Sequence, residues 1–255
     1  MQCRYLYFEE FTMSIWIDIS TNNNLILGVI IGIIILLVFI PIFGKIRDVK
    51  LIKSVTSTNR GTKSERDLVL RLLKKGISPQ TIFHDLCIEK RGEKFAQVDV
   101  VLATAEGIIV FEVKDFSGWI YGNGNYSHWT KVLAYGKRKY RFYNPIKQNS
   151  NHIKTLRKQL KQFEKIPFFS IVVFYGDCEL KEINYVPKGT FLIKPPRLFE
   201  VLKLIRKNND PAPYTNKQEI VNVLKQAVRN GESIDTQEKH IADIHDMLGK
   251  HRIFD

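Results

Sequence analysis

Two carboxylates and a lysine within residues 97–114 have the types and spacing that metal-assisted hydrolysis requires. This stretch predicts two strands joined at residues 105–107, the first carrying Asp99 and the second ending in Glu112 and Lys114. If the strands pair as a hairpin, Asp99 and Glu112 lie almost opposite each other at one end. Buried carboxylates need a partner. A divalent cation takes carboxylate oxygens, and a lysine can orient or deprotonate a water.

The alternation of side chains predicts which residues of the first strand share a face. One face would carry Gln97, Asp99 and Val101, and the other Val98, Val100 and Leu102. Residues 108–111 are apolar on both faces, which is typical of a buried central strand. An acid–lysine pattern by itself more often marks an ordinary hairpin with solvated charges at its end. The choice between such a hairpin and a metal site therefore depends on the surrounding sequence.

The length, the net charge and the cysteine spacing limit which classes of protein are possible. The 255 residues suffice for one sizeable soluble domain plus appendages, and the formal net charge is +13. The cysteines Cys3, Cys87 and Cys178 are widely spaced and form no CxxC motif. This spacing favours a reducing compartment over a disulfide framework.

Residues 25–43 form an uncharged apolar run of nineteen residues, long enough to span a bilayer. The flank before the run is acidic and the flank after it is basic, which favours an uncleaved anchor over a cleaved signal peptide. The positive-inside rule then places residues after 44 in the cytoplasm. Gly28 and Gly32 have GxxxG spacing, which is either a homodimer contact or a chance occurrence of small residues.

The expected organisation is a short extracytoplasmic N-terminus, a transmembrane helix, a basic linker, a globular domain with C-terminal helices, and an acidic C-terminal segment. Their boundaries are 1–24, 25–43, 44–60, 61–230 and 231–255. Within the domain, strands are expected at 82–88, 118–122, 126–133, 139–143, 168–175 and 190–193, and helices at 145–163, 198–205 and 216–228.

Two helices carry further candidates. Turn and cap residues at 58–62 predict a helix that runs to about Lys75, with Glu65 on the face of its apolar residues. A first-turn acid favoured by the helix dipole explains Glu65 equally well. Gln148 and His152 share one face of the helix that follows Asn144, and a solvated or locally bonded histidine is the commoner interpretation of His152.

The positive charge is concentrated between Lys131 and Lys165, where eleven Lys and Arg residues face a single acid, Glu164. Aromatic residues interleave with them, which suits a nucleic acid because cations hold the phosphates and rings stack on bases. A solvated helix face and a surface lying on anionic lipid are the competing interpretations. The cations and polar residues expected to contact nucleic acid are Lys137, Arg138, Lys139, Arg141, Lys147, Gln148 and His152.

Residues 60–175 resemble the nuclease-related domain (NERD) family, a branch of the PD-(D/E)XK nuclease superfamily. No single motif carries the resemblance; the ordered set does. The set comprises Gly61-x-x-x-Glu65, Gln97-Val98-Asp99, Gly107-Ile108-Ile109-Val110 running into Glu112-Val113-Lys114, Gly118-Trp119-Ile120, His128-Trp129 and Asn144-Pro145-x-x-Gln148-x-x-x-His152. The resemblance implies an α/β fold with a restriction-endonuclease-like mixed sheet flanked by helices.

The resemblance also implies roles for individual residues. Asp99 and Glu112 would bind Mg²⁺ or Mn²⁺, and Glu65 would add a ligand or hold a metal-bound water. Lys114 would position the attacking water and offset charge in the transition state. Gln148 matches a glutamine near the site in many relatives, whereas His152 stands where some branches carry tyrosine.

We therefore expect a membrane-anchored, metal-dependent nuclease that acts on nucleic acid, DNA more than RNA. The alternative is a non-catalytic nucleic-acid-binding or scaffold module at the cytoplasmic face of the membrane. Chelator separates the two, since binding by a scaffold would persist without metal.

Overall fold

The computed structural model describes residues 3–89, 95–133, 136–160, 165–214 and 216–233. The chain divides into two compact units, Met1–Lys50 and Leu51–Asp255. The acidic C-terminal segment expected at 231–255 lies almost entirely outside the described residues.

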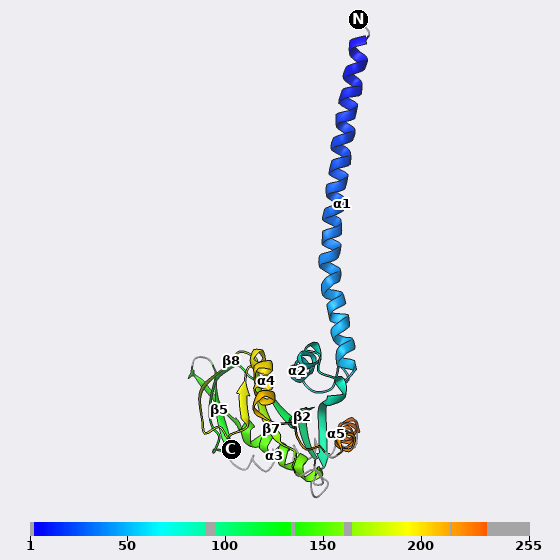
Figure 1. The fold of residues 1–255 in the computed structure, drawn as a ribbon. Helices are drawn as coiled ribbons and strands as arrows, with labels where there is room; N and C mark the ends of the chain where they lie inside the picture. The colour runs from blue at the N-terminus through cyan, green and yellow to red at the C-terminus, as the bar shows by residue number, and fades with distance from the viewer. Residues whose placement is uncertain (1–2, 90–94, 134–135, 161–164, 215, 234–255) are drawn as a thin grey trace. The chain divides into compact units, whose positions relative to one another are not determined.

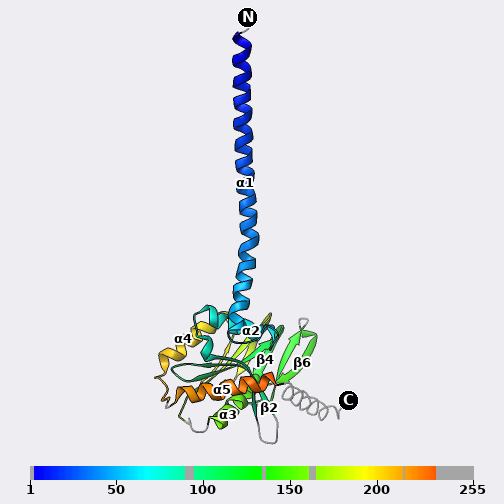
Figure 2. The ribbon, with the colours of Figure 1, turned by 90° about the vertical axis from the view of Figure 1, so that its right-hand side faces the viewer.

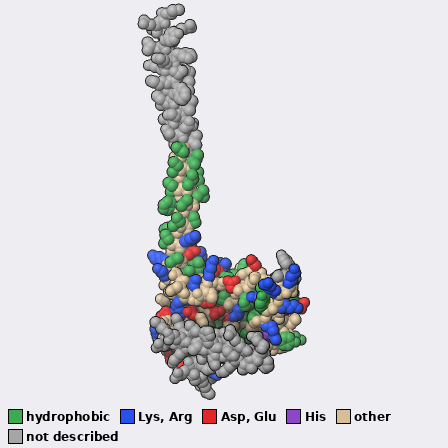
Figure 3. Space-filling model, turned by 180° about the vertical axis from the view of Figure 1, so that it is seen from behind, with side chains coloured by type: hydrophobic (Ala, Val, Ile, Leu, Met, Phe, Trp, Pro, Cys, Tyr) green, Lys and Arg blue, Asp and Glu red, His purple; other side chains and the backbone are tan. Residues whose placement is uncertain are grey.

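Helix α1 (Cys3–Lys53), which contains Pro41, runs through the first unit and ends within the first residues of the second. Its stretch Leu27–Lys53 is long and apolar enough to cross a membrane, and hydrophobic side chains cover it (Figure 3). The chain thus contains a candidate membrane span near its N-terminus. The helix continues to Lys53, so the basic residues expected in a linker lie on its last turns.

The second unit is built on a five-stranded mixed sheet in the order β1-β2-β3-β7-β9 (Figure 1). Antiparallel pairing joins β1, β2 and β3, and parallel pairing joins β3, β7 and β9. The strands are β1 (Ile82–Glu89), β2 (Phe95–Ala103), β3 (Ile108–Asp115), β7 (Phe168–Tyr175) and β9 (Thr190–Ile193). The sheet confirms the predicted mixed α/β fold, and the apolar run of β3 is central and buried, as expected.

A second, four-stranded sheet in the order β6-β5-β4-β8 was not expected as a separate unit. Its strands are β4 (Gly118–Asn123), β5 (His128–Leu133), β6 (Arg138–Tyr143) and β8 (Cys178–Asn184). The sequence analysis missed β8 because this edge strand is mostly exposed and rich in charge, so it lacks a continuous apolar run.

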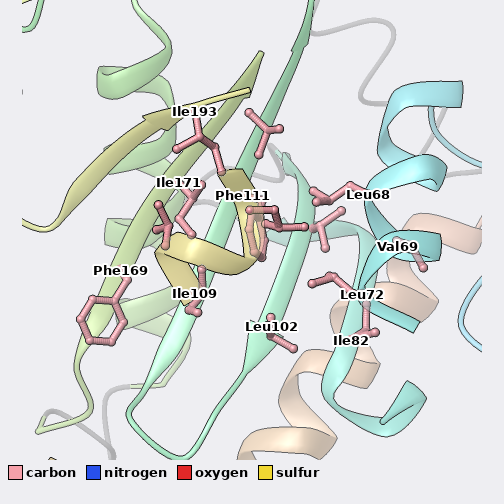
Figure 4. Packing of buried hydrophobic residues seen from close by; sticks show 14 of the residues in the cluster. Leu68, Val69, Leu72, Ile82, Leu102, Ile109, Phe111, Phe169, Ile171 and Ile193 are labelled. Carbon is pink, nitrogen blue, oxygen red and sulfur yellow. The ribbon is translucent and has the colours of Figure 1, made fainter. Parts of the chain in front are cut away.

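Helices cover both faces of the five-stranded sheet. On one face, α2 (Lys63–Lys74) and α4 (Leu198–Asn208) pack on one apolar cluster. Figure 4 shows Leu68 and Leu72 of α2 pointing toward the sheet, where Phe111 lies. On the other face, α3 (Pro145–Gln159) and α5 (Lys217–Glu232) pack on a second cluster, with α5 lying across β1 (Figure 2). Short 3₁₀ turns occur at Pro79–Thr81 and Pro195–Arg197.

One expectation about β2 is wrong. Val98 packs in the same cluster as Val101, not with Val100 as strict alternation predicted. The pairing with β1 passes from His84–Val100 to Leu86–Val98, and the intervening Asp85 has a φ of 56°. An L-residue in this left-handed region interrupts the pleat, and the side-chain order changes phase on both strands.

Candidate active site

The backbone pairing between β2 and β3 ends just before the two predicted carboxylates, Asp99 and Glu112. The last pair is Val100–Phe111, and beyond it the Oδ2 atom of Asp99 accepts a hydrogen bond of 2.7 Å from the backbone N–H of Val113. The side chain of Asp99 thus takes a backbone donor at the point where the strands separate. Asp99 and Glu112 are the next residues on the two strands, so they lie at one end of the hairpin, as predicted.

Glu112 is almost completely buried, with 1% of its surface exposed, and two basic groups contact it. Its Oε1 atom lies 2.6 Å from Nζ of Lys114, and its Oε2 atom lies 3.2 Å from Nε2 of His152. Lys114 also donates to Oε1 of Gln148 at 3.1 Å. The structure therefore brings together β3 and the predicted face of α3.

Two asparagines that were not predicted as site residues hold helix α3 in place, one through the turn after β4 and the other through β3. The side chain of Asn144 caps the helix by accepting from the N–H of Ile146, and it donates to backbone oxygens of the turn after β4. Asn149 is fully buried and donates to the carbonyl of Val110 and to Oγ of Ser170. These bonds fix Gln148 and His152 against Lys114 and Glu112.

Glu65 lies buried in the first turn of α2. Its Oε1 atom accepts from the hydroxyl of the N-cap residue Thr62 at 2.8 Å, and its N–H donates to the same hydroxyl at 3.2 Å. Its Oε2 atom is 3.3 Å from Nε2 of His84 in β1. Gly61 has a φ of 59°, and a Cβ there would lie 2.4 Å from Oε2 of Glu65, so the close approach requires glycine.

His84 is the main candidate that sequence analysis missed. The ring is 1% exposed, and its Nδ1 atom lies 2.9 Å from Oγ1 of Thr56, three residues after the end of α1. The strand around it, which is apolar except for Asp85 and the terminal Glu89, gave no signal for a functional role. Only the packing of α2 on β1 brings the histidine to Glu65.

The acidic groups influence one another. Burial raises the pKa of Asp99 well above the ordinary value, and the negative charges of Glu112 and Glu65 raise it further. The Val113 N–H and the charge of Lys114 oppose this shift only in part. Burial also opposes ionisation of Glu65, but the contacts with His84 and Thr62 outweigh it and lower the pKa of Glu65. The Asp99 carboxylate therefore lies in an excess of negative charge.

The donor set fits a hard divalent cation such as Mg²⁺. The Oε2 atoms of Glu65 and Glu112 are buried without a hydrogen bond, and excess negative charge acts on Asp99. Among the described residues no three His, Cys, Asp or Glu side chains converge at metal-ligand spacing. Mg²⁺ is usually held by one or two carboxylates plus waters and substrate phosphates, so a site with two carboxylates, Asp99 and Glu112, would fit it.

The predicted nucleic-acid-binding residues fall into two groups. Lys137, Arg138, Lys139 and Arg141 are exposed on the β5–β6 hairpin. Lys147 is half-buried and donates to the carbonyl of Asn125 at 2.7 Å. Basic side chains gather at the right-hand side of the domain in Figure 3, the side of the four-stranded sheet. Gln148 and His152 lie instead beside Lys114 and Glu112, and His152 is buried.

The fold is a mixed α/β domain with a buried cluster of acidic and basic side chains at the end of its central hairpin. Residues 60–175 match the family model of the nuclease-related domain, NERD. The chain is also 27% identical over 191 residues to an uncharacterized protein of Bacillus anthracis, a match that covers 74% of this chain and 85% of the relative. No solved structure matches. The family indicates a nuclease-like function and an interaction with nucleic acid.

Proposed function

We propose that the chain is a metal-dependent nuclease that hydrolyses phosphodiester bonds, with DNA as the preferred substrate. The observation that carries the proposal is the buried contact of Glu112 with Lys114 beside Asp99, at the end of the central hairpin. Such a cluster is costly to bury, and Asp99 and Lys114 at its edge are only partly buried.

Each polar residue has a role in this proposal. Asp99 and Glu112 hold Mg²⁺ or Mn²⁺, and Glu65 adds a ligand or holds a water of the metal. When bound, the metal supplies Lewis-acid polarisation of the phosphate and neutralises developing charge. Lys114 orients the water that attacks phosphorus, while Gln148 fixes the ammonium group of Lys114.

His152 fixes the carboxylate of Glu112 from the other side, since its Nε2 atom lies 3.2 Å from Oε2. His84 does the same for Glu65 at 3.3 Å. Both histidines are positioning residues, because each acts through the carboxylate that it contacts. Partners of this kind keep ligating carboxylates in one orientation.

The domain is proposed to lie on the cytoplasmic side of a membrane, anchored through residues 25–43. Support comes from the apolar part of α1 and from the basic residues that follow it. Gly28 and Gly32 are proposed as a homodimer contact within the bilayer. A protease-protection assay on sealed vesicles tests the orientation: the domain should be digested only when its side of the membrane is exposed.

A non-catalytic nucleic-acid-binding module is the second candidate function. One observation favours it: both oxygens of Glu112 already contact basic groups, Lys114 and His152, so the charge of Glu112 has partners without a metal. In this case the acidic cluster would only stabilise the junction of β3 and α3.

A cleavage assay separates the two functions. The full-length protein in detergent is mixed with labelled single- and double-stranded DNA and RNA, with Mg²⁺, Mn²⁺ or chelator. Glu112→Gln keeps the shape of the side chain and should abolish metal-dependent cleavage. Glu179→Gln, an exposed position on β8, is the matched control and should cleave like the unaltered protein. Binding without cleavage in every metal would overturn the nuclease and favour the binding module.

A further inference from the structure

Lys131 in β5 lies against two aromatic rings and has no acidic partner among the described residues. Its Nζ atom is 4.8 Å from the centroid of the Phe116 ring and 5.6 Å from that of Tyr140. A cation over an aromatic face gains about 0.5–1 kcal/mol at an exposed site, and its charge stays unneutralised. Lys131 is therefore a positioned cation that can still bind an anion.

The backbone register determines which residues accompany Lys131. Across the ladder it pairs with Tyr140, just as Trp129 pairs with Phe142. Because side chains alternate along each strand, Lys131 and Tyr140 stand on the same face as Trp129 and Phe142. Trp129 is buried and Phe142 contacts Phe116, so this is the inner face of the hairpin.

This inner face is directly connected to the candidate active site. Phe116 follows Lys114 by two residues, and its ring centroid is 4.8 Å from that of Phe142. A short, packed segment thus links Lys114 to Lys131. The register also divides the basic residues of β6, since Arg138 shares the inner face whereas Lys139 and Arg141 stand on the outer one.

Tyr140 adds a surface that suits a nucleobase. The residue is 46% exposed although its ring lies beside Lys131. Stacking of a base on an aromatic side chain contributes about 1–3 kcal/mol. A base inside a duplex is already stacked on both faces, so only an unpaired base can use such a ring.

We propose that Lys131 and Tyr140 form a subsite for one nucleotide of a single-stranded nucleic acid. Lys131 binds the backbone phosphate and Tyr140 stacks on the unpaired base. The inference rests on the proposed function in one respect: the nucleic-acid strand bound at this subsite must continue to Glu112 and Lys114. It adds the substrate class, a strand that is single-stranded next to the site of cleavage.

The test is a binding measurement in chelator, with full-length protein in detergent and a labelled oligothymidylate or a duplex of the same length. Lys131→Gln should weaken binding of the single strand about fivefold to tenfold and lower the salt slope by about 0.7, the value for one phosphate contact. Lys131→Arg should restore binding. Lys225→Gln, an exposed position on α5, is the control for loss of one positive charge.

Tyr140→Ala should weaken single-strand binding about fivefold or more and leave duplex binding unchanged, whereas Tyr140→Phe should bind normally. Equal effects of Lys131→Gln and Lys225→Gln, or equal losses for single strand and duplex in Tyr140→Ala, would overturn the subsite. Because metal is absent, the result is independent of catalysis. Glu112-dependent cleavage with unaltered binding in these variants would overturn the subsite alone.

Discussion

The two sheets of the domain place charge in opposite environments. In the five-stranded sheet, β3 is buried from Ile108 to Glu112. The carboxylate of Glu112 contacts Lys114 and His152. In the four-stranded sheet, every residue of β6 except the half-buried Phe142 is exposed. Burial fixes the position and alters the protonation of a few groups, whereas exposure leaves many cations solvated and free to meet an anion. The proposed function therefore assigns reaction chemistry and substrate contact to different sheets.

Truncation of a core residue in the five-stranded sheet should have the largest effect on stability. Phe111→Ala removes a fully buried ring beneath α2 and should cost about 3–5 kcal/mol of unfolding free energy. Chemical denaturation measures the loss. Tyr140→Ala in the exposed sheet is the comparison and should change stability by less than about 0.5 kcal/mol. Similar losses in both sheets would contradict the proposed division.

Removal of three hairpin cations should have the next largest effect. The variant Arg138→Gln, Lys139→Gln, Arg141→Gln should lower the affinity for nucleic acid by about 10- to 100-fold at moderate salt and leave the fold intact. Fluorescence anisotropy over a salt series measures both affinity and slope. A triple variant with unaltered affinity would show that the substrate does not cross β6.

The positioning role of His152 predicts a smaller effect, confined to the reaction step. His152→Ala should lower metal-dependent cleavage by about 10- to 100-fold, because its contact with Glu112 orients that carboxylate. Affinity for the oligonucleotide in chelator should not change. The opposite pattern, weaker binding with an unaltered cleavage step, would place His152 in contact with substrate.

The acidic cluster predicts a modest pH dependence of stability in metal-free protein. The pKa of Asp99 is raised above its ordinary value of 3.8, so the folded state holds this proton more tightly than the unfolded state. Stability should therefore fall as the pH rises from the ordinary value through the raised one. Asp99→Asn keeps an acceptor for the Val113 N–H and removes the charge, so it should flatten this decline and raise the melting temperature at neutral pH in chelator. An unaltered pH profile would contradict the shift.

Local patterns predicted much of the candidate site. Turn position and alternation placed Asp99 and Glu112 at one end of a hairpin, and helical spacing placed Gln148 and His152 on one face of α3. These relations span few residues and depend on backbone periodicity alone. Metal binding and the contacts with nucleic acid remain predictions.

Other features depend on contacts between distant segments. His84 meets Glu65 and Thr56 only after β1 and α2 have packed together, and no local pattern marks that meeting. The change of phase in β2 follows from the positive φ of Asp85 on the neighbouring strand. The sequence did not distinguish Lys131 from the other cations of the basic stretch. Its two ring contacts come from other segments: Tyr140 lies in β6, and Phe116 lies between β3 and β4.

The side chain of Arg60 has a consequence for the limits of the folded unit. It pairs with Asp85 and also with Glu232, the last residue of α5, each at 3.0 Å. A Cβ at Gly231 would lie 2.6 Å from the carbonyl oxygen of Asp85, so the end of α5 is packed closely against this part of β1. The expected boundaries at 61 and 230 would cut both partners away. Because Arg60 and Glu232 meet, a short peptide could join residues 60 and 232, and a circularly permuted chain could keep the same fold.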